Sequence, residues 1–95
     1  MTEETATFYL APAMRLEQCE AFDAFLRASR ADAVTVDCAN VSRLGGMAAQ
    51  QIVMAQKIWA AAGHEFALIN VSDGMQKSLS TLGLDILLPE EVATV

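Results

Sequence analysis

The sequence predicts an α/β fold in which a mostly parallel sheet of four strands packs against about three helices. Segments with strand composition alternate with segments of helical periodicity along the chain, as expected for such a fold. The length of 95 residues is that of one domain. The hydrophobic content of 54%, with 19% charged residues, is enough to fill a core and excludes intrinsic disorder.

The expected strands and helices alternate along the chain, and the series begins and ends with a strand. The strands are expected at residues 7–10, 32–37, 65–70 and 85–88, and the helices at residues 15–30, 47–62 and 73–82. This alternation predicts crossover connections between parallel strands rather than hairpins. The domain spans residues 1–95, with tails expected at residues 1–5 and 90–95.

The first strand, the first helix and the second strand are predicted from composition and spacing. Thr7 to Leu10 has strand composition, and Pro12 ends the strand because proline has no amide hydrogen for a ladder. The buried face of the helix is predicted from three apolar residues at helical spacing, namely Cys19, Phe22 and Leu26. Between Asp32 and Asp37, β-branched residues predict a central strand.

The second helix is the longest expected element, and its outer side is unusually apolar. No glycine or proline interrupts it between Met47 and Ala62, and Gly63 ends it. At 100° per residue, the core side carries Ala48, Ile52, Ala55, Trp59 and Ala62. The solvent side carries Met47, Gln50, Met54, Lys57 and Ala61. An exposed apolar side of this kind indicates an interaction surface.

The last third of the chain predicts a buried strand, a short helix and a final strand. Phe66 to Ile69 is a continuous apolar run, typical of a strand inside a parallel sheet. Ser72 or Asp73 is expected to cap the third helix, and Gly83 to end it. The buried face of that helix is expected to carry Met75, Leu79 and Leu82. Asp85 to Leu88 is the expected fourth strand.

The charge balance and the apolar runs restrict the partners and the location. Twelve acidic and six basic residues give a net charge of −6, which repels the phosphates of nucleic acids and anionic membranes. The apolar run from Ile58 to Gly63 is far shorter than the roughly 20 residues of a membrane span. The start, Met1 to Glu4, lacks the basic residues of a signal peptide. We therefore expect a cytoplasmic protein with reduced thiols at Cys19 and Cys38, and no nucleic-acid binding or membrane insertion.

Few residues offer catalytic or metal-binding chemistry. His64 is the single histidine, and it stands at an expected turn where a polar residue is ordinary. Cys19, Cys38 and His64 lack the paired spacing of zinc ligands, and the glycines at 45–46 lack the other residues of a phosphate loop. We expect no enzyme, metal or cofactor. The alternatives are a small-ligand or thiol redox site at Cys38, with or without His64, and a ligand-binding role for Asp37 at a strand end.

Three stretches of the chain, residues 34–59, 66–72 and 79–84, resemble the STAS family, whose founding members are bacterial anti-sigma factor antagonists. In that family a strand ending in Asp-Leu-Ser is followed by Asp-Ser-Ser-Gly-Leu at the start of the second helix. Here Asp37-Cys38-Ala39 and Gly45-Gly46-Met47-Ala48-Ala49 stand at the two positions. The resemblance covers residues 8–88 and implies a STAS-like mixed, mostly parallel sheet.

This sequence departs from the family at the phosphorylated position. Met47 stands where the family has the serine that a partner kinase phosphorylates, and Gly46 and Gly45 replace the neighbouring serine and aspartate. Because methionine cannot accept a phosphate, the resemblance implies no phosphorylation at Met47. Ser42 and Ser72 are the remaining hydroxyls nearby, and each is explained more simply as a loop or cap residue.

These features predict a non-catalytic protein that binds a signalling kinase. The expected contact residues are Met47, Gln50, Met54, Lys57, Ser42 and Gly46. Residues 55–59, 70–72 and 83–85 resemble the single-domain STAS proteins of alphaproteobacterial chemotaxis systems, whose partner is a histidine kinase. The alternative roles are an anti-sigma factor antagonist that binds an anti-sigma kinase and a STAS subunit of an ABC-type transporter. A surface this apolar also allows a homodimer.

Overall fold

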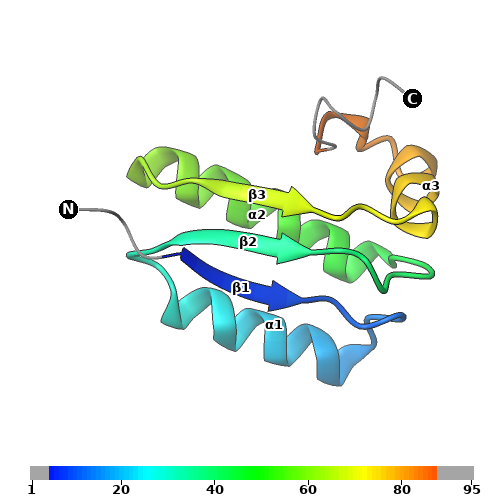
Figure 1. Ribbon diagram of the computed structural model, residues 1–95, viewed down its shortest axis with the longest axis horizontal. Coiled ribbons are helices and arrows are strands. Elements are labelled where there is room, and N and C mark those ends of the chain that lie inside the picture. The colour runs from blue at the N-terminus through cyan, green and yellow to red at the C-terminus, as the bar shows by residue number, and fades with distance from the viewer. Residues whose placement is uncertain (1–4, 88–95) are drawn as a thin grey trace.

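A computed structural model describes residues 5–87, which form a parallel sheet with helices on one face (Figure 1). Its strands are β1 (Thr5–Tyr9), β2 (Ala33–Asp37) and β3 (Phe66–Ile69). Its helices are α1 (Leu16–Ala28), α2 (Gly46–Ala62) and α3 (Asp73–Thr81), followed by the short 3₁₀ helix η1 (Asp85–Leu87). The predicted α/β class is confirmed.

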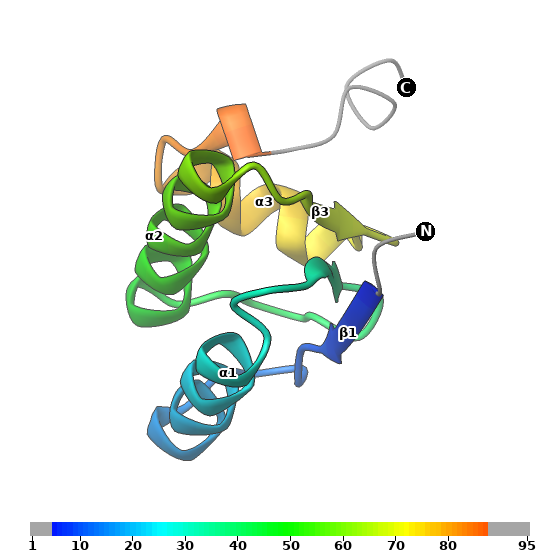
Figure 2. The same cartoon turned by 90° about the vertical axis from the view of Figure 1, so that its left-hand side faces the viewer.

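The three described strands run parallel in the order β1-β2-β3. Thr7 pairs with Thr35, which in turn pairs with Ala67. Helices α1 and α2 lie side by side on one face of this sheet, and α3 lies near its carboxyl end (Figures 1 and 2). The carboxyl ends of the strands and the start of α2 therefore meet at one end of the domain (Figure 1).

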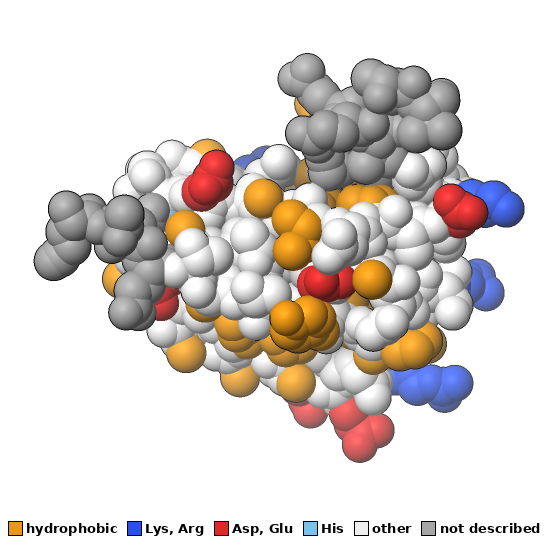
Figure 3. Space-filling model, viewed as in Figure 1, with side chains coloured by type: hydrophobic (Ala, Val, Ile, Leu, Met, Phe, Trp, Pro, Cys, Tyr) orange, Lys and Arg blue, Asp and Glu red, His pale blue; other side chains and the backbone are white. Residues whose placement is uncertain are grey.

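Side chains on β1 and β2 alternate between the core and the uncovered face of the sheet. Val34 and Val36 are fully buried beneath the helices, whereas Thr7 and Tyr9 are exposed. The hydroxyls of Thr7 and Thr35 lie 2.8 Å apart and form a hydrogen bond across the two strands. Figure 3 shows this uncovered face, where apolar side chains lie among polar ones.

The core lies between the sheet and the pair α1 and α2. Trp59 and Phe22 are its largest fully buried side chains. The indole N–H of Trp59 donates to the carbonyl of Asp32 at 2.8 Å, so the one polar atom of this ring is paired. Phe8 packs beneath α1 with its ring centroid 4.9 Å from that of Phe22. The expected core side of α2 is buried except for Ala62, which is exposed at the end of the helix.

The expected fourth strand is wrong within the described residues, because Asp85–Leu87 forms the 3₁₀ helix η1. Gly83 adopts φ 74°, which turns the chain after α3. The amide of Leu84 then donates to the carbonyl of Leu79 at 2.7 Å, and the amide of Leu87 donates to Leu84 at 3.0 Å. These local bonds use the backbone groups that a strand would present to its neighbour.

The end of α3 also differs from the prediction. The helix stops at Thr81, and Leu82, which was expected on its buried face, is exposed. Of the expected tails, residue 5 belongs to β1, while residues 1–4 and 90–95 lie outside the described residues, as does residue 88 of the expected strand.

Candidate partner-binding site

The loop between β2 and α2, residues 38–45, carries the sequence that resembles the STAS family. Its first turn is organised by Asp37, whose Oδ1 accepts the amide of Ala39 at 2.9 Å. The other carboxylate oxygen, Oδ2, accepts the side-chain amide of Asn70 at 2.9 Å. Asn70 follows β3 and has φ 53°, a conformation that asparagine tolerates better than most residues. Asp37 therefore ties together the ends of two strands, a structural role at the position considered for ligand binding.

The middle of this loop is fastened on one side to the β1–α1 connection. The amides of Ser42 and Arg43 both donate to the carbonyl of Pro12, at 3.0 and 3.3 Å. An isolated parallel bridge between Ala13 and Arg43 extends the same contact. Backbone hydrogen bonds from two successive residues hold the loop at a defined distance from the start of α1.

On its other side the loop is fastened to α3. Ser72 caps α3 by accepting the amide of Met75 at 3.1 Å, and its hydroxyl also donates to the carbonyl of Val41 at 2.6 Å. The amide of Leu44 donates to the hydroxyl of Ser78 at 2.8 Å. Ser72 and Ser78 are thus structural residues that connect α3 to the loop, and this agrees with the cap predicted for Ser72.

Gly74 allows α3 to pack closely against the backbone of the loop. A Cβ atom at this position would lie 2.2 Å from the carbonyl oxygen of Ser42 and 2.8 Å from that of Val41. Because both atoms belong to the backbone, no rotation of a side chain relieves the clash. The packing of the site therefore depends on the absence of a side chain at position 74.

Helix α2 begins in this loop with an uncapped N-terminus. Its N-cap is Gly45, and no side chain makes a capping hydrogen bond there. The first turn contains no acidic residue to complement the positive end of the helix dipole. Met47, at the second position of the helix, is 56% exposed. The structure thus places the residue at the family's phosphorylation position on the surface, at a helix start free of acidic side chains.

A pocket of about 420 Å³ lies between this loop and α3. Two of the expected contact residues, Ser42 and Gly46, line it together with Arg43 and Lys77. Within residues 5–87, neither Arg43 nor Lys77 forms an ion pair. The pocket is therefore a polar, positively charged recess beside the start of α2.

The other expected contact residues lie along the outer side of α2. We define the α2 stripe as Met47, Gln50, Met54 and Lys57, all of which are exposed. Met54, at 59% exposure, is as accessible as Met47. The angular spacing of the helix thus places the stripe away from the core, as the sequence predicts.

The structure adds residues to this surface that the sequence does not single out. Gly46 and Gln50 share a shallow apolar groove of about 300 Å³ with Leu82 and Leu84, from the segment after α3. On the opposite side of the stripe, Met54 borders a second groove that is formed with α1. These neighbours come from distant parts of the chain. In the sequence, only the apolar Leu82 could have indicated this extension of the surface. The prediction placed Leu82 on the buried face of the third helix, so it was not recognised as a surface residue.

The alternative of a thiol site at Cys38 does not fit the geometry. Cys38 is fully buried, and burial, together with the smaller effect of the nearby Asp37 carboxylate, raises the pKa of its thiol to about 12. His64 precedes β3, whereas Cys38 follows β2, and the strands are parallel. Six residues of extended chain separate the two levels, which is about 20 Å. The thiol is therefore protonated at neutral pH and far from the histidine.

Within residues 5–87, no group of three or more His, Cys, Asp or Glu side chains is arranged to hold a metal ion. None of the helices in that range is long and apolar enough to cross a membrane.

Comparison with known proteins gives one family match. No curated protein matches the sequence significantly. The family described as "Mlab, STAS domain" matches residues 1–89, which include the sheet, the three helices and the loop before α2. STAS domains act as regulatory modules that bind other proteins. The match confirms the resemblance seen in the sequence, and the chain belongs to the family described as "Mlab, STAS domain".

Proposed function

We propose that this protein is a non-catalytic regulator that binds a signalling kinase through the α2 stripe and the adjoining loop before α2. The observation that supports this proposal is the exposure of Met47 and Met54 on one side of a long helix, at 56% and 59%. Exposed methionines are unfavourable in water unless a partner covers them. Because each is already partly buried, covering the rest of its surface would contribute about 1–2 kcal/mol to association.

The chemistry of the α2 stripe suits a protein partner better than a small ligand. Methionine side chains are flexible and polarizable, so they adapt to the shape of a partner surface. Gln50 and Lys57 lie on the same side and add polar contacts that define orientation. The grooves on either side of the stripe extend it into a continuous surface that reaches from α1 to the end of α3.

The partner that we propose is a chemotaxis histidine kinase in the cytoplasm. Support comes from the sequence likeness at residues 55–59, 70–72 and 83–85 to the single-domain STAS proteins of chemotaxis systems. Met47 replaces the serine that kinases phosphorylate in other members of the family. Binding would therefore be controlled by the abundance or state of the kinase rather than by phosphorylation at this position.

Replacing Met54 with glutamate is expected to lower the affinity for the kinase at least about tenfold, because a charge would be placed in the centre of an apolar contact. The free energy of unfolding should change by less than about 0.5 kcal/mol, since the side chain is on the surface. Isothermal titration calorimetry with the purified histidine kinase measures the affinity, and urea denaturation measures the stability.

The matched control is Leu16→Glu, which places the same charge at a side chain that is 60% exposed but lies at the start of α1. This variant should bind like the wild type. Equal losses in both variants would point to a general charge effect, and unchanged binding by Met54→Glu would reject the α2 stripe. Parallel titrations with an anti-sigma kinase and with the ATPase of an ABC-type transporter distinguish the alternative partners. If the wild type binds one of these instead of the histidine kinase, the partner that we propose is wrong.

A further inference from the structure

A groove between α1 and α2 continues the α2 stripe on the side that faces α1. Its volume is about 370 Å³. The apolar part of its lining consists of Leu26, Met54, Ala55, Ile58 and Trp59. Asp23, Arg27, Arg30 and Gln51 supply the polar part. Because every lining residue belongs to α1, to the turn after it or to α2, the groove is a trough with two helical walls.

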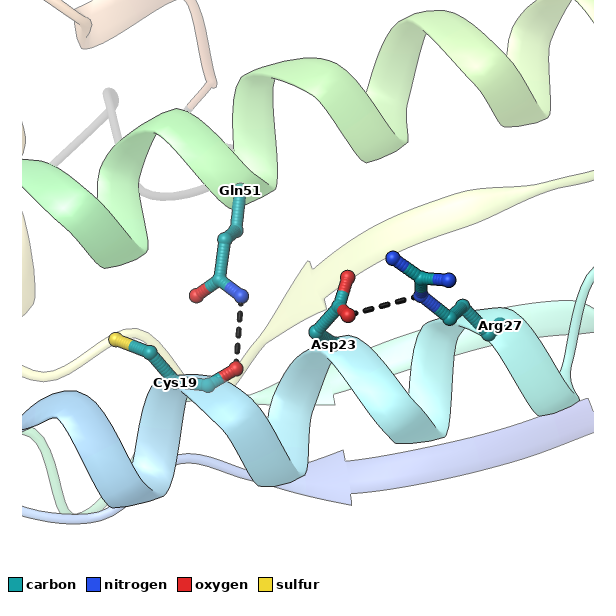
Figure 4. Close-up of polar contacts among 4 residues, drawn as sticks. All are labelled: Cys19, Asp23, Arg27 and Gln51. Carbon is teal, nitrogen blue, oxygen red and sulfur yellow. Dashed lines mark hydrogen bonds and ion pairs between the residues drawn. The ribbon is translucent and has the colours of Figure 1, made fainter.

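Gln51 connects the two walls of this groove. Its Nε2 donates to the carbonyl of Cys19 at 2.8 Å, which links α2 to the backbone of α1 (Figure 4). Its Oε1 is the one buried side-chain nitrogen or oxygen atom within residues 5–87 that has no hydrogen-bond partner. A link of this kind sets the separation of the helices before a partner arrives, which lowers the entropic cost of binding.

The walls determine the form of the occupant. Both are helices, whose backbone groups are already paired, so an extended peptide would find no strand edge to bond with. A helix satisfies its own backbone and presents apolar side chains at positions i, i+3, i+4 and i+7. Such a row of side chains packs into the trough between two neighbouring helices.

The charges at the rim determine the flanking residues of that helix. Arg27 is paired with Asp23 at 2.9 Å (Figure 4). Arg30 forms no ion pair within residues 5–87. The two arginines and one aspartate leave one net positive charge at the rim, on a chain whose net charge is −6. An acidic side chain on the bound helix complements this positive charge. The rest of the protein surface is acidic on balance and would repel it.

We infer that the α1–α2 groove binds an amphipathic helix of a partner protein, with its apolar side chains in the trough and an Asp or Glu beside Arg30. This inference rests on the protein-binding role proposed above, but it does not depend on the partner being a histidine kinase. Ile58 and Arg30 belong to the groove and not to the α2 stripe, so their substitution tests the groove separately.

The test is selection of helical peptides against the intact protein. The probe is a phage-displayed library of amphipathic helices of about five turns, with fixed apolar positions and randomised flanking residues. Selected helices should carry Asp or Glu at one end. Their affinity for Arg30→Glu and for Ile58→Glu should fall about tenfold or more, as fluorescence anisotropy measures. The exposed Arg15, which lines neither this groove nor the recess beside α2, supplies the matched charge reversal Arg15→Glu. The affinity of the selected helices for this variant should stay within about twofold of their affinity for the wild type.

Each outcome decides the inference. Selection of basic rather than acidic ends, equal binding by Arg30→Glu and the wild type, or failure to select any helix would overturn it. Because Arg30 is exposed, Arg30→Glu should fold like the wild type. The comparison of Arg30→Glu with the wild type therefore tests the inference even if Ile58→Glu does not fold. If helices bind the groove while the histidine kinase does not bind the protein, the groove stands and the proposed function fails. If the kinase binds through Met54 but no helix occupies the groove, the proposed function stands and the inference about the groove fails.

Discussion

Replacing Gly74 with alanine is expected to destabilise the protein by about 3 kcal/mol or more, because the added methyl group would clash with the backbone of the loop before α2. The new Cβ would lie 2.2 Å from the carbonyl oxygen of Ser42 and 2.7 Å from its carbonyl carbon. Relief requires α3 to move away from the loop before α2. That movement would weaken the hydrogen bonds from Ser72 to Val41 and from Leu44 to Ser78.

Urea denaturation followed by circular dichroism measures this loss. The matched control is Gly46→Ala in the first turn of α2, where an added Cβ meets no atom within 4 Å. That variant should be as stable as the wild type or more stable by up to about 1 kcal/mol, because alanine favours helices over glycine. A Gly74→Ala protein that is within 1 kcal/mol of the wild type would contradict the close packing of α3 on the loop.

Replacing Trp59 with alanine is expected to cost about 3–5 kcal/mol, which is a large part of the stability of a small domain. The side chain is 2% exposed, and its ring centroid lies 5.9 Å from that of Phe66, so its removal leaves a cavity between α2 and β3. It also removes the hydrogen bond from the indole to the carbonyl of Asp32.

Trp59→Phe separates these contributions. Phenylalanine keeps most of the ring contact with Phe66 and loses the hydrogen bond, so the expected cost is smaller, about 1–2 kcal/mol. The free energy of unfolding from urea denaturation should therefore fall in the order wild type, Trp59→Phe, Trp59→Ala. Equal stability of the two variants would show that the ring itself contributes little to the packing of α2.

The elements defined by local pattern could be predicted from the sequence. Helix α2 was expected at residues 47–62 and runs from Gly46 to Ala62, since a long periodic segment ends at a glycine with φ 79°. Strands β2 and β3 agree with the prediction within one residue at each end, because apolar runs bounded by polar residues mark buried strands. The exposure of the α2 stripe also follows from local spacing alone.

The fourth strand could not be judged from local pattern. Two or three apolar residues after a glycine fit a strand and a 3₁₀ turn equally well, and the choice depends on what the segment packs against. Here Leu87 is buried while Ile86 is exposed, and backbone bonds to the end of α3 complete the turn. These bonds are local, but the burial of Leu87 in the core is a tertiary contact that the neighbouring sequence does not show.

The shape of the candidate site likewise depends on residues far apart in the sequence. Gly74 lies against Ser42, and Gln51 reaches the carbonyl of Cys19. The helical periodicity of the sequence predicts which side of α2 faces solvent. It does not predict the grooves beside that side, because the opposite walls belong to α1 and to the segment after α3.

The most direct test of the α2 stripe as the kinase-binding surface is a methyl nuclear magnetic resonance titration with ¹³C-labelled methionine. Met47 and Met54 are exposed on α2, whereas Met14 and Met75 are buried and act as internal controls in the same spectrum. On addition of the histidine kinase, the methyl signals of Met47 and Met54 should shift or broaden, and those of Met14 and Met75 should stay unchanged. Binding that leaves Met47 and Met54 unperturbed, or the absence of any change at a saturating kinase concentration, would contradict the proposed function.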